Sequence, residues 1–344
     1  MFDIRHKDAP PDFQKNTSDP SAYSWGSIGK HNVVLASLPA GQYGLISAAT
    51  MAQGLRSSLP HTRVGLLVGI GAGVPGEQPG KDGQPTVLRD IRLGDVAVSM
   101  PDSTNGGVVQ FDLVKAKRAG DEEVTERKGF LNSPPTAVRS ALSKLQASHE
   151  LDDSTLPDLI EQAFQRYKKM RTKYSHPGIA TQGNIGARDV YHTRDGTEIV
   201  QEARTIPEVH YGTIASRNTL EKSASHRDKV LTQLKKEGIQ PICFEMEAAG
   251  LMNSFPCLVI RGICDYADEY KNDHWQRYAA ATAAAFAKEF LSCVDAEEVQ
   301  RTQKIGELFQ KLKRGQDEPE AKSGKYMSWS WPEKEWRMVF VAMS

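Results

Sequence analysis

Continuous apolar runs of strand length recur along this 344-residue chain, and stretches of helical character separate them. The runs at 31–38, 64–70 and 257–264 contain few charged residues, as do strands that are buried on both faces of a parallel sheet. An Ala- and Leu-rich stretch at about 45–58 predicts a helix, which ends near Pro60 because a helical residue before proline is strained. The order strand, helix, strand indicates an α/β fold with a largely parallel sheet.

Weaker patterns predict the remaining elements. Strands are expected at 90–99 and 208–216, and the Asn-Gly turn at 105–107 indicates a hairpin before residues 108–112. The stretch 172–207 is rich in Gly, Thr and Asp, which predicts a long excursion over the surface. Four further helices are expected at about 134–148, 156–171, 219–237 and 277–294.

Composition changes twice along the chain. Residues 1–27 are polar and give no long element, and after Asp295 the chain becomes charged, helical at first and then linker-like. We therefore expect a polar N-terminal segment at 1–27, one α/β domain at 28–295 and a charged helical and linker tail at 296–344. Three tryptophans of this tail have no evident partner: Trp329, Trp331 and Trp336.

The overall charge points to neither nucleic acid nor a membrane as a partner. The 43 basic and 43 acidic residues cancel, which leaves no general attraction to polyanions. No apolar run approaches the roughly 20 residues of a membrane span, and we expect a soluble, cytoplasmic protein. The four cysteines lack metal-ligand spacing, so we expect reduced core cysteines, no metal site and no cofactor.

Carboxylates cluster where two apolar strands are expected to end. Glu245 and Glu247 follow the run that ends at Cys243, and Asp265 and Asp268 follow the run 257–264. Ligands of open α/β sheets bind at the carboxyl ends of the strands, so these acids are candidate site residues. Taken alone, Asp265 is equally well explained as a helix N-cap, and Glu247 as a carboxylate in the first turn of a helix.

Five motifs occur in an order that resembles the purine/uridine phosphorylase and nucleosidase superfamily. They are LPAG at 38–41, VGIGAGVP at 68–75, DIRLGDV at 90–96, FEMEAAGL at 244–251 and RGICDYAD at 261–268. More narrowly, residues 23–294 resemble the N-terminal nucleoside phosphorylase-like domain of fungal receptor-like proteins that continue into NACHT, ankyrin or tetratricopeptide modules. The resemblance implies a three-layer α/β/α fold around a mixed, largely parallel sheet, and a homo-oligomer.

The resemblance also implies roles for particular residues. Met246 and Glu247 would hold the ribose of a purine nucleoside, and Asp265 would protonate the base at N7. Such roles suit a reaction that builds positive charge on the sugar and negative charge on the leaving base. Other expected substrate-binding residues are Phe244, Gly71 and Ala72 in a glycine loop at 69–73, and Ser216 and Asn218 in a segment of the base pocket. Arg217 departs from the small residue expected in that segment.

The acceptor of the ribosyl group is expected to be water. Phosphorylases of the superfamily carry an arginine just before the glycine motif, where this chain has Leu66, Leu67 and Val68. Hydrolysis of adenosine, AMP or ATP is therefore favoured over phosphorolysis, which remains the alternative. Four cations are candidates to meet a phosphate tail: Lys30, Arg188, Arg194 and Arg217.

A second departure concerns the start of the domain. Relatives begin with an additional apolar strand, and a loop after it carries the glutamate that activates water in hydrolytic members. No such strand precedes Val33, so we expect a sheet without its first strand and a site without this base. A purine-binding or interaction domain with impaired catalysis is therefore a third reading, because a positioned base contributes about 10²- to 10⁴-fold to a rate.

Overall fold

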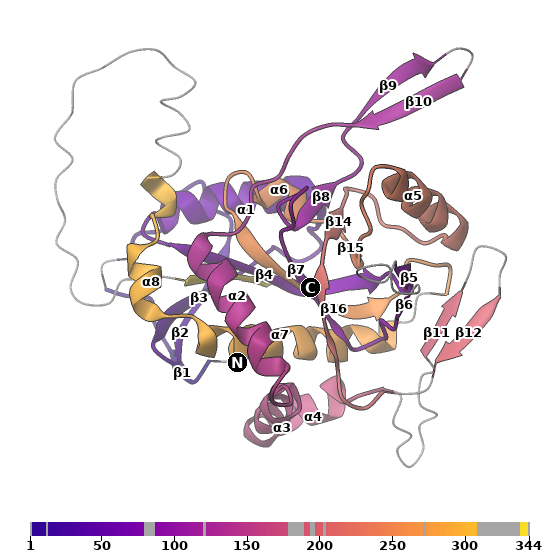
Figure 1. Ribbon diagram of the computed structural model, residues 1–344. Helices are drawn as coiled ribbons and strands as arrows, with labels where there is room; N and C mark the ends of the chain where they lie inside the picture. Colours follow the sequence, from indigo (N-terminus) through magenta and orange to yellow (C-terminus); the bar gives the residue numbers. More distant parts are fainter. Residues whose placement is uncertain are drawn as a thin grey trace, which may run out of the picture.

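The fold is a three-layer α/β/α arrangement in which a curled sheet lies between two groups of helices (Figure 1). The computed structural model describes residues 2–11, 13–78, 87–119, 122–177, 189–192, 197–201, 204–270, 273–307 and 338–342. The α/β architecture predicted from the sequence is confirmed.

One half of the sheet consists of strands around β4 (Val64–Gly73). The N-terminal hairpin of β2 (Ala22–Ile28) and β3 (His31–Ser37) is antiparallel, and β1 (Ile4–His6) extends its edge. Strand β17 (Met338–Ala342) lies between β3 and β4 and runs parallel to both.

The other half curls away from this plane because β4 changes partners along its length. Its residues 65–72 pair in parallel with β16 (Cys257–Asp265), whereas Ala72 and Gly73 pair antiparallel with β15 (Cys243–Glu245). Beyond β15 lie β14 (Ile214–Ser216) and β8 (Val108–Gln110), and beyond β16 lie β7 (Val96–Ser99) and β13 (Val209–Gly212). The ends of β15 and β16 are thereby brought to one side of β4.

Helices cover both faces of the sheet. On one face, α1 (Gly44–Ser58) packs against the short α6 (Ala248–Leu251). On the other, α7 (Gln276–Cys293) packs along β16 and β4 and is contacted by α2, α3 and α4. The close approach of α7 requires Gly262, because a Cβ atom there would lie 1.8 Å from the carbonyl oxygen of Ala279.

The other elements lie at the periphery. The helices are α2 (Thr136–His149), α3 (Leu156–Arg166), α4 (Lys168–Tyr174), α5 (Ala224–Lys236), α8 (Ala296–Arg301) and the 3-10 turn η2 (Asp273–Trp275). The strands form three hairpins, β5–β6 (Gly76–Gln78, Val87–Arg89), β9–β10 (Val114–Ala119, Glu122–Arg127) and β11–β12 (Asp189–His192, Glu198–Gln201). The helices expected at 45–58, 134–148, 219–237 and 277–294 correspond to α1, α2, α5 and α7, and the one at 156–171 is divided into α3 and α4.

Three local predictions were wrong. Residues 69–73 are not a loop, because β4 continues through Gly73 and remains paired with β15 and β16. The turn at 105–107 does not form a hairpin, since β8 pairs in parallel with β14. The N-terminal segment 1–27 does contain a long element, because β2 begins at Ala22 and pairs with β3 along its whole length.

The expectation that the sheet lacks a strand is also wrong. The interior position between β3 and β4 is filled by β17, which comes from the end of the chain rather than from its beginning. The stretch expected to be a charged tail therefore contributes a central strand, while the division at residue 295 remains a prediction. Trp329, Trp331 and Trp336 lie outside the described residues. No helix among the described residues has the length and apolar character needed to cross a membrane.

Candidate functional site

A cavity of about 340 Å³ lies where β4, β15 and β16 end. Six of the eight residues expected to form the site line this cavity: Gly71, Ala72, Phe244, Met246, Glu247 and Asp265. They come from three strand ends that are far apart in sequence. The curl of the sheet at β4 is what brings them together.

Asp265 is the last residue of β16 and is 8% exposed. Its Oδ1 accepts a hydrogen bond from the backbone N–H of Ala267 at 3.0 Å, and its Oδ2 accepts one from the thiol of Cys264 at 3.3 Å. Ala267 has φ +56°, a left-handed conformation that is uncommon for a residue with a side chain. The turn after β16 thus holds the carboxyl group of Asp265 at the cavity wall.

Glu245, Glu247 and Arg261 form a buried charge cluster beside Asp265. The Nη2 of Arg261 donates to Oε2 of Glu245 and to Oε2 of Glu247, the latter at 3.1 Å, and the guanidinium is 1% exposed. Glu245 also accepts hydrogen bonds from the backbone N–H groups of Glu247 and Ala248. Glu247 accepts a further one from Gly44 N–H at 3.2 Å, at the start of α1.

The cluster sets the protonation behaviour of its members. Burial raises the pKa of Glu247 above its usual value, and the neighbouring charge of Glu245 adds to this effect, while Arg261 opposes it. Although burial favours loss of its proton, the two carboxylates raise the pKa of Arg261 above its usual value. The cluster therefore combines a permanent cation with one carboxylate, Glu247, that binds a proton more tightly than usual.

Apolar and aromatic side chains form another part of the cavity wall. The rings of Phe244 and Phe111 lie 5.6 Å apart at an angle of 60°. Gly71 faces the cavity from β4, and a Cβ atom there would lie 2.5 Å from the sulfur of Cys243. Together with Ile70 and Val230, these residues form a surface that suits the flat face of a heterocyclic base.

Ser216 and Asn218 do not line the cavity. The hydroxyl oxygen of Ser216 accepts a hydrogen bond from Ala249 N–H at 3.0 Å and so fixes α6 to β14. The side chain of Asn218 is exposed and accepts a hydrogen bond from Leu45 N–H at 3.1 Å. Both side chains support elements that surround the cavity.

Arg217 lines the cavity and is held in an ion pair. Its Nη2 lies 2.7 Å from Oε2 of Glu221, its Nε donates to the carbonyl oxygen of Thr219, and its guanidinium lies 5.4 Å from the centre of the Phe111 ring. Of the other cations considered for a phosphate tail, Lys30 lies in the exposed turn between β2 and β3. Arg188 and Arg194 lie outside the described residues.

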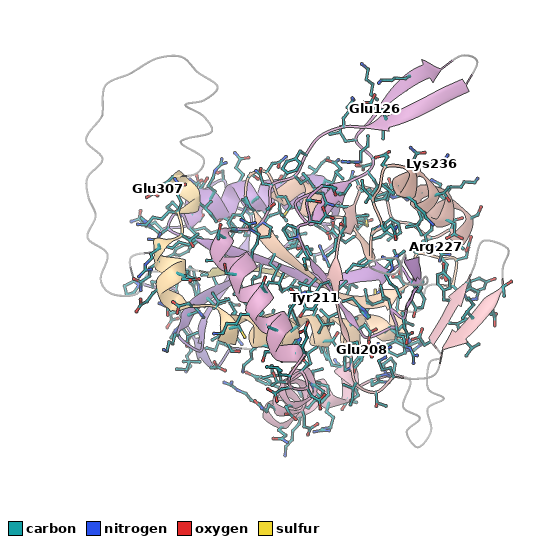
Figure 2. The ribbon with its side chains drawn as sticks, in the orientation of Figure 1. Glu126, Glu208, Tyr211, Arg227, Lys236 and Glu307 are labelled. Atoms are coloured by element: carbon teal, nitrogen blue, oxygen red, sulfur yellow. The ribbon has the colours of Figure 1, made fainter. Side chains whose placement is uncertain are left out.

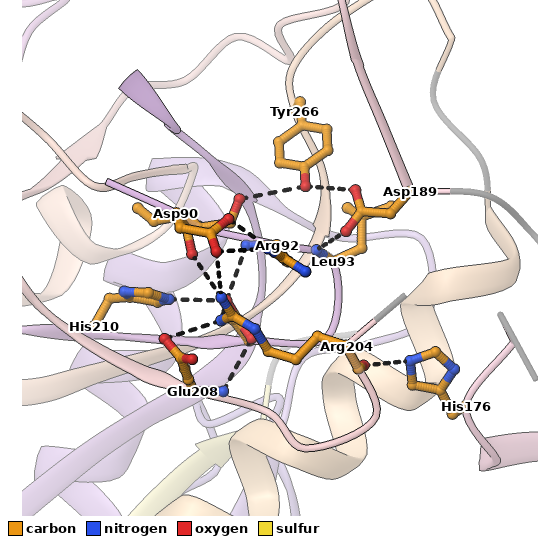
Figure 3. Close-up of polar contacts among 11 residues, drawn as sticks. Asp90, Arg92, Leu93, His176, Asp189, Arg204, Glu208, His210 and Tyr266 are labelled. Carbon is orange, nitrogen blue, oxygen red and sulfur yellow. Dashed lines mark hydrogen bonds and ion pairs between the residues drawn. The ribbon is translucent and has the colours of Figure 1, made fainter. Parts of the chain in front are cut away.

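A second polar cluster contains Arg204 and Tyr266, the residue that follows Asp265 (Figure 3). The backbone of Asp95 accepts a hydrogen bond from Ile263 N–H at 2.8 Å, and its carboxylate binds Arg204 and His210, each at 2.8 Å. The hydroxyl of Tyr266 donates to Asp189 at 2.6 Å. Ile263, two residues before Asp265, is thereby anchored to Asp95, just before β7, and Tyr266 is anchored to Asp189 of β11.

Arg227 of α5, labelled in Figure 2, anchors the same turn from another direction. Its side chain is fully buried and donates to the carbonyl oxygens of Tyr266 at 2.9 Å and His192 at 2.8 Å. The guanidinium lies 4.5 Å from the centre of the Tyr191 ring. The backbone that follows Asp265 is therefore rigidly held.

Sequence reasoning gave no site role to Arg261, Glu221 and Cys264, which are among the described residues that line the cavity. Arg261 was visible as the sole charge in the run 257–264, which is a signal for a buried ion pair. Glu221 and Cys264 gave no signal, because the sequence does not show that the local pairs Arg217–Glu221 and Cys264–Asp265 lie at this cavity.

Comparison with known proteins gives one sequence relative and a set of similar folds. The chain is 39% identical over 290 residues to a nucleotide-binding leucine-rich repeat (NLR)-like protein of Hyaloscypha variabilis, a match that covers 83% of this chain. The chain spans only 27% of the length of that relative. No protein-family model matches the sequence.

The similar solved structures include nucleosidases at low sequence identity. The Helicobacter pylori MTAN bound to 5′-methylthioadenosine matches with a TM-score of 0.47 and 14% identity, over 82% of this chain and 89% of that one. Futalosine hydrolase of Helicobacter pylori matches with a TM-score of 0.42 and 14% identity, over 82% and 88%. The 5′-methylthioadenosine/S-adenosylhomocysteine nucleosidase of Neisseria meningitidis, in complex with methylthio-immucillin-A, gives 0.43 and 15%, over 79% and 86%.

The sequence relative agrees with the narrower resemblance drawn from the ordered motifs, and the sheet and its helical layers agree with the expected fold. The chain therefore belongs to the family of this NLR-like protein, as a homologue of part of it, and it has a three-layer α/β/α fold.

Proposed function

We propose that this chain cleaves the N-ribosidic bond of a purine nucleoside or nucleotide, with water as the favoured acceptor. The observation that supports the proposal is the meeting of Asp265 and Glu247 in one cavity, each buried and each at the end of a different strand. Beside them are an aromatic wall and the Gly71–Ala72 backbone of β4.

The two carboxyl groups suit the two ends of the bond that breaks. The bond between C1′ of the ribose and N9 of the purine breaks, its electron pair goes to the base, and Asp265 gives a proton to N7. Positive charge then develops on the ribose, and a water oxygen forms the new bond to C1′. The proton that this water loses passes to solvent, from which Asp265 regains the proton that it gave to N7. Glu247 accepts hydrogen bonds from the ribose hydroxyls, and Met246 packs against the sugar.

The chemistry of the wall favours water over phosphate as the acceptor. The positions before the glycine motif are Leu66, Leu67 and Val68, which are buried and apolar. Two cations belong to the described lining of the cavity, Arg217 and Arg261, and each is already paired with carboxylates. A phosphate ion would have to compete with those carboxylates for either guanidinium.

Product analysis tests the proposal. The purified chain is incubated with adenosine, inosine, AMP or ATP, with and without inorganic phosphate, and free base is measured by chromatography. We expect base release that does not depend on phosphate, and a loss of about 10²- to 10⁴-fold in the Asp265→Asn variant. Asp153→Asn, a change at an exposed carboxylate, is the matched control.

Three outcomes would contradict parts of the proposal. Base release that requires phosphate would establish the phosphorylase alternative. Release that is unchanged in a folded Asp265→Asn variant would remove Asp265 from the reaction. Absence of release from every substrate, with retained purine binding, would assign the cavity to a binding domain.

A further inference from the structure

The charged residues of the cavity lining indicate which kind of substrate the cavity favours, which the fold alone does not. Its described lining contains four carboxylates, Glu221, Glu245, Glu247 and Asp265. The cations of that lining are Arg217 and Arg261. With Asp265 carrying the proton that it gives to N7 and the other three carboxylates ionised, the described lining has one more ionised carboxylate than it has cations and is net negative. A partly enclosed site strengthens the field of such a charge compared with bulk water.

Neither cation is placed to overcome this surplus. Arg261 is 1% exposed and is shared between Glu245 and Glu247. Arg217 is turned toward Glu221 at 2.7 Å and is held there by the carbonyl oxygen of Thr219 and the Phe111 ring.

Glu221 is itself firmly fixed in this position. Its Oε1 accepts hydrogen bonds from the backbone N–H groups of Lys222 and Ser223, at 3.2 and 3.1 Å. Its Oε2 binds His226 Nδ1 at 2.5 Å as well as Arg217. A carboxylate with four partners does not turn away to release Arg217 for an incoming anion.

We infer that this cavity selects purine nucleosides without a phosphate group, and that Glu221 is a specificity-determining residue because it neutralises Arg217. The inference rests on the proposed function and narrows its substrate class. A 5′-phosphate brings one to two negative charges into a wall with surplus carboxylates, whereas a 5′-hydroxyl brings none. Removal of the Glu221 charge leaves Arg217 as a free cation at the wall, where a phosphate is a suitable partner.

The inference is tested by binding, so that it does not depend on catalysis. The ligands are a C-nucleoside analogue of adenosine, which has no N-ribosidic bond to cleave, and its 5′-monophosphate. Dissociation constants for the full chain are measured by titration calorimetry. We expect the monophosphate to bind about tenfold more weakly or worse, because the surplus negative charge of the cavity lining repels two phosphate charges.

The Glu221→Gln variant gives the second arm. It should lower the ratio of the two dissociation constants by about five- to tenfold, and the double variant Arg217→Gln/Glu221→Gln should restore the ratio. Glu150→Gln, at an exposed residue after α2, is the control and should leave the ratio unchanged. Base release from adenosine and AMP, measured in parallel, should show the same shift in the ratio of their kcat/KM values.

The possible results separate the inference from the proposed function. A monophosphate that binds as tightly as the nucleoside analogue, or a ratio unaffected by Glu221→Gln, would overturn the inference even if base is released. Weak monophosphate binding that is relieved in Glu221→Gln, without any base release, would support the inference and overturn the proposed hydrolysis. Failure of both analogues to bind would overturn the two together.

Discussion

Replacement of Arg261 by methionine removes the buried cation that two carboxylates share. Methionine retains much of the apolar volume of the side chain, so the main change is the loss of charge and of hydrogen-bond donors. Glu245 and Glu247, which are 5% and 8% exposed, would then face each other without a counter-ion. The structure predicts a large loss of stability from one substitution in the middle of β16.

The size of this loss follows from the burial of all three groups. Removal of one partner from a buried ion pair costs about 3–5 kcal/mol, because the charge that remains is uncompensated. The N–H groups of Glu247, Ala248 and Gly44 still bind the carboxylates and keep the loss within that range. For a domain of this size the corresponding fall in Tm is roughly 6–15 °C.

The assay is urea denaturation of the parent and of Arg261→Met at pH 7 and again at pH 5. The deficit should shrink at the lower pH, because carboxylates without a counter-ion take up protons and lose their repulsion. Arg277→Met, at an exposed position of α7, is the matched control and should change stability by less than about 0.5 kcal/mol. If the two variants lost the same amount, or if the deficit were independent of pH, the charge cluster would not be what stabilises this part of the fold.

Three further results are expected. Gly262→Ala should lower the stability of the protein by about 3 kcal/mol in thermal unfolding, because its Cβ would lie 1.8 Å from a carbonyl oxygen of α7. Gly306→Ala, whose Cβ would have its nearest atom at 3.2 Å, is the control and should cost much less. Val339→Pro should lower the urea midpoint by the equivalent of at least about 2 kcal/mol, since β17 is paired on both sides, while Arg5→Pro in the edge strand β1 should be milder. Since burial raises the pKa of Glu247, the parent should lose stability as pH rises from about 4.5 through the raised pKa, and Glu247→Gln should lack this slope in urea titrations at several pH values.

Much of the sheet could be predicted because its strands are buried on both faces. Such strands must be apolar along their whole length, and the runs at 31–38, 64–70 and 257–264 therefore identified β3, β4 and β16. The same reasoning failed at Gly69–Gly73, where glycines indicated a loop. Those glycines serve pairing rather than turning, because Gly71 and Gly73 lie against Cys243 and Ile263 of neighbouring strands.

The position of β17 could not be predicted because strand pairing is a long-range property. A five-residue apolar stretch can pair as a strand wherever two neighbouring strands have free hydrogen-bonding edges. The gap between β3 and β4 is created by residues some 270 positions earlier, so no window around Met338 contains the information that assigns it there.

The candidate site, like the sheet, could be predicted from the sequence only in part. Acids at the ends of two strands could be found from the sequence, since the chain direction of a parallel sheet brings such ends together. Their electrostatic partner Arg261 could not be assigned, because it reaches Glu245 and Glu247 only after β15 and β16 have packed. The local pair of Arg217 and Glu221 gave no sign that it lies at the cavity. Ser216 and Asn218 were predicted to lie in the base pocket only because their segment resembles one in relatives. In the structure, their hydrogen bonds with Ala249 and Leu45 support the elements around the cavity.

The acidic surplus of the cavity connects the proposed reaction with the inferred selectivity. When an N-ribosidic bond breaks, the ribose approaches a cation, and carboxylates near C1′ stabilise that charge more strongly in the transition state than in the substrate. A nearby phosphate would supply the same kind of charge but would have to enter against Glu221, Glu245 and Glu247. A wall that favours the developing sugar cation thus disfavours an anionic substrate for the same electrostatic reason. Glu221→Gln should therefore gain nucleotide binding while losing part of the rate with nucleosides, and a variant that improved both would separate the two effects.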